Sequence, residues 1–132
     1  MSDAKKIVIP CSGIGKAFGT VAREATYQLT ETSHSDEFRT MCLPLLVAGD
    51  QEAVSLVQNS HVYTIDGCPK KCATLCIERI GVKVTKEVMV PKVLAANTEH
   101  KPDSLRNIGD GGRLLAKDIV QIILGDGCDE YE

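Results

Sequence analysis

Short runs of apolar and β-branched residues alternate along this chain with stretches in which apolar residues recur every three or four positions. The first pattern is typical of strands with a buried face, and the second is typical of amphipathic helices. The runs predict strands at residues 7–9, 38–43, 61–65 and 82–90. The helical spacing predicts helices at residues 17–29, 50–59, 68–80 and 112–124.

Local signals mark the ends of several elements. Asp50 is a favourable N-cap residue, and Pro69 stands where the first turn of a helix accepts proline. Gly81 is a natural helix terminator. Residues 30–37 and 92–110 are polar and are expected to be loops.

Strands that alternate with helices imply crossover connections and a parallel sheet. We therefore expect an α/β fold: a three-layer arrangement with a small, mostly parallel sheet of about four strands, flanked by helices. The 132 residues suit one domain, with neither an internal repeat nor a linker. Residues 1–132 are thus predicted to be one unit, whose acidic tail begins at about residue 125.

Composition narrows the class of protein. The chain is 43% hydrophobic and 25% charged with a formal net charge of −3, which argues against nucleic-acid binding because that function favours a basic face. The sequence has no apolar stretch long enough for a signal peptide or a membrane span. We therefore expect a cytoplasmic protein whose six cysteines remain reduced.

Four cysteines are expected at one edge of the sheet. Cys11 follows the first predicted strand, Cys42 lies near the end of the second, and Cys68 follows the third, with Cys72 one helical turn later. Ligands of open parallel sheets bind beyond the carboxyl ends of the strands. Thiolates gathered there could bind zinc, with Zn–S bonds of about 2.3 Å, or an iron–sulfur cluster.

Two neighbouring residues are expected to support this site. Asp66 is predicted to orient the turn by accepting backbone N–H bonds, and Gly67 to let the backbone approach the metal. Cys76 is predicted to be a buried core thiol. Cys128, in the acidic tail, is predicted to be incidental.

The segments that carry these cysteines resemble a known family. Asp66-Gly67-Cys68-Pro69-Lys70-Lys71-Cys72, together with Pro10-Cys11-Ser12-Gly13, is similar to the DGC-domain family of predicted zinc-binding proteins. The resemblance covers most of the chain and implies that Cys11, Cys42, Cys68 and Cys72 are the metal ligands. It implies no established reaction.

Other motifs fit poorly. Residues 13–17 suggest a phosphate loop, but Pro10 and Ala17 stand where a Walker loop has glycine and serine or threonine. A low-molecular-weight phosphatase loop needs arginine at Ala17. The histidines at positions 34, 61 and 100 are expected to be solvated.

The leading hypothesis is a cysteine-thiolate metal-binding protein that acts in metal or sulfur handling or in redox chemistry. The main alternative is a thiol-based redox protein or cysteine enzyme, in which Cys68 attacks and Cys72 resolves without a permanent metal. A third reading is an interaction module whose cysteines only fill space. The sequence leaves open whether the protein is an enzyme and whether it binds a protein partner or forms a homodimer.

Overall fold

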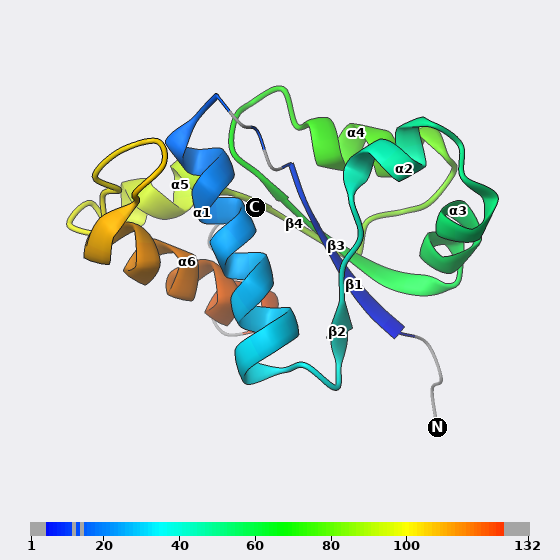
Figure 1. The fold of residues 1–132 in the computed structure, drawn as a ribbon, viewed down its shortest axis with the longest axis horizontal. Coiled ribbons are helices and arrows are strands. Elements are labelled where there is room, and N and C mark those ends of the chain that lie inside the picture. The colour runs from blue at the N-terminus through cyan, green and yellow to red at the C-terminus, as the bar shows by residue number, and fades with distance from the viewer. Residues whose placement is uncertain (1–4, 12, 14, 126–132) are drawn as a thin grey trace.

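The computed structural model describes residues 5–11, 13 and 15–125. Their centre is a sheet of four parallel strands in the order β2-β1-β3-β4 (Figure 1). The strands are β1 (Lys5–Pro10), β2 (Phe38–Arg39), β3 (Ser60–Asp66) and β4 (Lys86–Met89). The predicted α/β class and strand number are therefore confirmed.

Helices cover both faces of the sheet (Figure 1). One face is covered by α1 (Ala17–Tyr27), which continues into a π-helical segment η1 (Gln28–Ser33), and by α5 (Val90–Ala96) and α6 (Gly109–Ile123). The other face is covered by α2 (Leu43–Val47), α3 (Gln51–Gln58) and α4 (Cys72–Arg79). No helix among the described residues is both long and apolar enough to cross a membrane.

The alternation of side chains along β1 divides the core in two. Val8 packs into the cluster beneath α1 and α6, whereas Ile7 and Ile9 pack into the cluster beneath α2, α3 and α4. All three side chains are fully buried. A strand covered on both faces has no polar side, which explains the uninterrupted apolar run in the sequence.

The second strand is shorter than predicted. It pairs with β1 only at Lys6↔Phe38 and Ile7↔Arg39, so the predicted extent of residues 38–43 is wrong beyond Arg39. Pro44 lies in the first turn of α2, a position that proline favours, and the chain leaves the sheet to begin that helix. Cys42 is consequently the N-cap of α2 and does not lie at a strand end.

Four further boundaries differ from the prediction. The helix expected at residues 68–80 begins at Cys72, and the strand expected at 82–90 spans only Lys86–Met89. The polar stretch 92–110 begins inside helix α5, whose first turn contains Pro91. The expected loop at residues 30–37 is partly the π-helical segment. Elsewhere the sequence pattern agrees closely, as for α3, where the Asp50 side chain accepts a hydrogen bond from the Ala53 amide.

Candidate cysteine site

Cys11 joins the ends of two neighbouring strands. Its amide donates a hydrogen bond to the Ile65 carbonyl at 2.9 Å, which extends the β1–β3 pairing by one residue. Its Sγ accepts a hydrogen bond from the Gly67 amide at 3.2 Å. The half-buried thiol therefore lies directly beside the chain segment that leads into Cys68.

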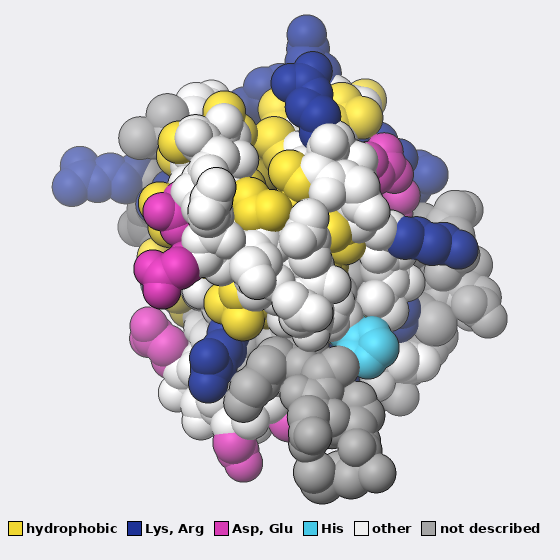
Figure 2. Space-filling model, turned by 90° about the vertical axis from the view of Figure 1, so that its right-hand side faces the viewer, with side chains coloured by type: hydrophobic (Ala, Val, Ile, Leu, Met, Phe, Trp, Pro, Cys, Tyr) yellow, Lys and Arg dark blue, Asp and Glu magenta, His cyan; other side chains and the backbone are white. Residues whose placement is uncertain are grey.

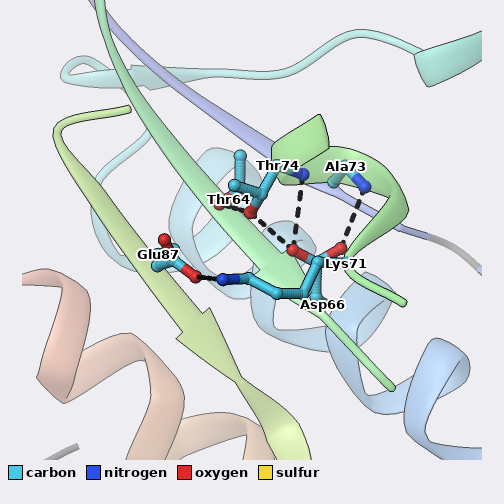
Figure 3. A network of polar contacts seen from close by, with 6 residues as sticks. All are labelled: Thr64, Asp66, Lys71, Ala73, Thr74 and Glu87. Atoms are coloured by element: carbon cyan, nitrogen blue, oxygen red, sulfur yellow. Dashed lines mark hydrogen bonds and ion pairs between the residues drawn. The ribbon is translucent and has the colours of Figure 1, made fainter. Parts of the chain in front are cut away.

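Asp66 fixes the start of helix α4 from the last position of β3 (Figure 3). Its Oδ1 accepts from the Ala73 amide at 2.9 Å, and its Oδ2 accepts from the Thr74 hydroxyl at 2.6 Å and from the Thr74 amide at 3.4 Å. The carboxylate is only 2% exposed, so these bonds replace its lost hydration. The prediction that Asp66 orients this turn is confirmed.

Thr74 also hydrogen-bonds to the hydroxyl of Thr64 on β3, at 2.7 Å. Sequence inspection missed this buried pair, because an isolated threonine in a strand or helix carries no signal of its partner.

Lys71 separates Cys68 from the helix. Its backbone is left-handed, with φ 54° and ψ 49°, and its amide donates to the Cys68 carbonyl at 3.1 Å to close a turn. Cys68 therefore belongs to a loop, and the expectation that it lies one helical turn before Cys72 is wrong. A left-handed non-glycine residue is uncommon and persists where the surrounding contacts determine it.

The Lys71 side chain is held by an ion pair with Glu87 on β4, with Nζ 2.5 Å from Oε1. The hydrogen bond to the Glu87 carboxylate raises the pKa of Lys71 above its usual 10.5, and the charges of Glu87, Asp66 and Glu78 add to this effect. Partial desolvation acts in the opposite direction. No motif in the sequence indicates this pair, which depends on the β3–β4 pairing.

Two glycines allow helix α1 to lie close to this region. A Cβ at Gly67 would come within 3.1 Å of the Phe18 carbonyl carbon and 3.2 Å of the Gly19 nitrogen. A Cβ at Gly19 would come within 2.0 Å of the Gly13 oxygen. The structural requirement at Gly67 is thus the approach of α1, which differs from the predicted approach of a metal.

Cys11 and Cys42 line the same pocket, which has a volume of about 730 Å³. Cys11 is half-buried, and Cys42 is exposed. The structure therefore brings these two predicted ligands to a common cavity.

The four predicted ligands all follow the carboxyl ends of adjacent strands. Cys11 follows β1, Cys42 lies three residues after β2, and Cys68 lies two residues after β3. Cys72 begins the helix that Asp66 caps. Their thiols are free, and among the described residues no three or more Cys, His, Asp or Glu side chains are grouped closely enough to hold a metal ion. The donors suit a thiophilic metal, but they are not assembled around one point.

The remaining cysteines differ from expectation or lie outside the structure. Cys76 was predicted to be buried, yet it is half-exposed on α4, one turn after Cys72. The buried face of that helix is formed instead by Ala73, Thr74 and Ile77. Cys128 lies outside the described residues.

The contacts of His34 and His100 are with residues other than cysteine. The His34 ring nitrogen contacts the Ser33 hydroxyl at 2.8 Å, and His61 is exposed. His100 was expected to be solvated, but it is half-buried with Nδ1 2.6 Å from Oδ2 of Asp118. That pair joins the loop before α6 to the helix itself.

Comparison with known proteins identifies a family. A family model described as the DGC domain matches residues 7–109, a span that contains β2, β3 and β4, all but the first two residues of β1, and each of the four predicted ligands. No curated protein and no solved structure matches the chain in the corresponding searches.

Proposed function

Because this chain belongs to the DGC-domain family, we propose that it is a cysteine-thiolate metal-binding protein whose ligands are Cys11, Cys42, Cys68 and Cys72. The metal is zinc or the iron of an iron–sulfur cluster, since four thiolates suit both. The observation that carries the proposal is the contact between the Cys11 thiol and the Gly67 amide. It links the cysteine after β1 to the loop that holds Cys68.

The protein surroundings favour thiolates. The Gly67 amide already donates to Cys11 Sγ, and N–H donors of this kind stabilise negative charge on a metal-bound sulfur. Asp66 and Lys71 fix the loop at both ends, through α4 and through β4 respectively. Because no three donors are grouped among the described residues, binding of a metal by all four thiols would require the side chains and loops that hold them to rearrange.

A full set of four thiolates leaves no coordination position for substrate, which argues for a storage, transfer or structural role. The exposure of Cys42 and Cys72 favours transfer, because an incoming ligand can reach them.

The surrounding surface also suits a protein partner. Figure 2 shows hydrophobic side chains gathered on the upper half of the face formed by α2, α3 and α4. The exposed large hydrophobic residues of α2 and α4 are Leu45, Val47 and Leu75, and Val47 is 69% exposed. Apolar surface beside exposed ligands is expected in a protein that delivers metal or sulfur to another protein.

Anaerobic purification tests the proposal directly. We expect the protein to contain zinc, or iron with acid-labile sulfide, and we expect the four thiols to resist alkylation until a chelator releases the metal. Cys76 serves as the internal control, because its reactivity should not depend on the chelator. Protein that contains no metal and cannot be loaded with either zinc or iron and sulfide would overturn the proposal.

Thiol redox chemistry is the second candidate, and two observations favour it. Cys68 and Cys72 stand on either side of the Lys71 turn, and no three donors are assembled among the described residues. In this reading Cys68 attacks a disulfide substrate and releases a substrate thiol, and Cys72 then displaces the second thiol as the Cys68–Cys72 disulfide forms. A metal-free protein that forms this disulfide in a defined glutathione buffer would favour this candidate.

A further inference from the structure

We propose that the pocket between helix α1 and residues 40–48 binds a small molecule with an apolar body and a single anionic group. The proposal concerns a ligand of the protein and does not require a bound metal. It uses the cavity that Cys11 and Cys42 share, but its principal determinants are other residues.

The pocket exists because β2 ends early. β1 continues to Pro10, whereas β2 stops pairing at Arg39, so within the described part of the chain no strand lies beside the last part of β1 on this side. The connection that leads from β2 into α2 runs past this end of β1 (Figure 1) and forms one wall. Helix α1 forms the opposite wall through Arg23, Thr26 and Tyr27. The resulting volume of about 730 Å³ is within the range of small-molecule sites.

The lining is mostly apolar, although Tyr27 and Thr40 also contribute hydroxyl-bearing side chains. Its hydrophobic side chains come from the end of β1 and from the segment that contains α2: Pro10, Met41, Leu43, Pro44, Val47 and Ala48. The Thr26 hydroxyl is already bonded to the Ala22 carbonyl at 3.0 Å, so it adds little polarity. An occupant that removes this surface from water gains free energy in proportion to the apolar area covered.

The positive charge of Arg23 favours an anionic ligand over a cationic one. Among the described residues that line the pocket, Arg23 is the only charged side chain and none is acidic. A guanidinium carries five N–H donors in a planar fork, so it can bind a carboxylate, sulfonate or phosphate in addition to contacts within the protein. A cation at the same place would meet like charge, and this difference gives the site its selectivity.

Octanoate is the appropriate probe, because it has a flexible apolar chain and one carboxylate. We expect calorimetric titration of the full chain to show saturable binding of octanoate and markedly weaker binding of octylammonium, which has the same chain and the opposite charge. Absence of octanoate binding at millimolar concentration, or equal binding of both ions, would overturn the proposal.

Variants then locate the site. Arg23→Gln should weaken octanoate binding by about tenfold or more, and Arg23→Lys should preserve most of it. Arg106→Gln is the matched control, because Arg106 is exposed and does not line the pocket. An equal loss in the control would refute the assignment.

Since Arg23 is half-buried, its replacement could also affect folding. Ala48→Trp provides a second test, because it fills the pocket from an exposed position and should abolish binding while the thermal midpoint is preserved. A folded Ala48→Trp protein that binds octanoate normally would exclude this pocket. Metal content measured on the same samples distinguishes this result from failure of the proposed metal site, because Arg23→Gln and Ala48→Trp leave all four thiols in place.

Discussion

The Gly67 amide donates a hydrogen bond to Sγ of Cys11 across 3.2 Å, although the two residues are 56 positions apart in the chain. This contact joins the turn after β1 to the turn after β3. Both turns pack beneath the first part of α1, where a Cβ at Gly67 would press within 3.1 Å of the Phe18 backbone. The stability and chemistry of the site can therefore be altered by changes at a few defined positions.

Gly67→Ala is expected to lower the free energy of unfolding by about 1–3 kcal/mol, because the added methyl group would press against the backbone of Phe18 and Gly19. Urea unfolding followed by circular dichroism measures the change. Gly15→Ala is the matched control, since no atom lies within 4 Å of a Cβ there, and it should change stability by no more than about 0.5 kcal/mol. Similar effects for both substitutions would contradict the role of the close approach.

Asp66→Asn is expected to cost about 2–4 kcal/mol of stability, because it removes the charge and places an amide N–H₂ group against donors from residues 73 and 74. Chemical denaturation provides the measurement. Asp50→Asn makes the same change at the N-cap of α3, where asparagine is as suitable as aspartate, and should have little effect. If the two substitutions lower the free energy of unfolding equally, the hydrogen-bond network in Figure 3 does not contribute the stability that we assign to it.

The Lys71–Glu87 pair should make a pH-dependent contribution. Since the pKa of Lys71 is raised in the folded protein, its contribution to stability is complete below pH 10.5 and is lost as the pH rises through the raised pKa. Glu87→Gln should therefore cost up to about 1 kcal/mol near neutral pH, because both side chains are partly exposed, and progressively less above pH 10.5. Unfolding curves of the unmodified protein and of Glu87→Gln, recorded from neutral pH to above pH 10.5, test whether their free energies of unfolding converge. A difference that stays constant with pH would rule out this ionic contribution.

Cys72 and Cys76 lie one turn apart on α4 and are predicted to differ in metal binding. Cys72→Ser should greatly weaken zinc binding, because serine replaces a thiolate ligand, whereas Cys76→Ser should bind zinc as tightly as the unmodified protein. Competition with a chromophoric chelator measures both affinities. A comparable loss in the two variants would mean that the helix contributes a ligand set different from the one proposed.

The sequence pattern was most informative where elements are buried on one defined face or on both. The apolar run of β1 and the spacing of Leu115, Ile119 and Ile122 in α6 reflect direct burial, and both elements were predicted close to their observed bounds. It was least informative near prolines. The sequence pattern predicts neither α2 nor α5, although Pro44 and Pro91 each lie in the first turn of one of these helices, where the missing N–H has no intrahelical partner to lose.

The sequence predicts which residues contribute to the candidate site better than it predicts how they are arranged. The strand ends placed Cys11 and Cys68 on one edge, and Asp66 was correctly expected to bind backbone amides. The left-handed conformation of Lys71 was not predictable, because it depends on contacts with β4 and on the Asp66 cap. The pocket was missed for a similar reason, since it results from the early end of β2.

Gly19 has a consequence for how the site is prepared. A Cβ there would collide with the backbone oxygen of Gly13, so the chain just beyond Cys11 rests directly on the first turn of α1. The packing of a helix on a strand, completed during folding, thus determines where this thiol stands. For the proposed metal site this means that Cys11 is positioned by the fold before any ligand binds, so that part of the ordering cost of binding is met during folding.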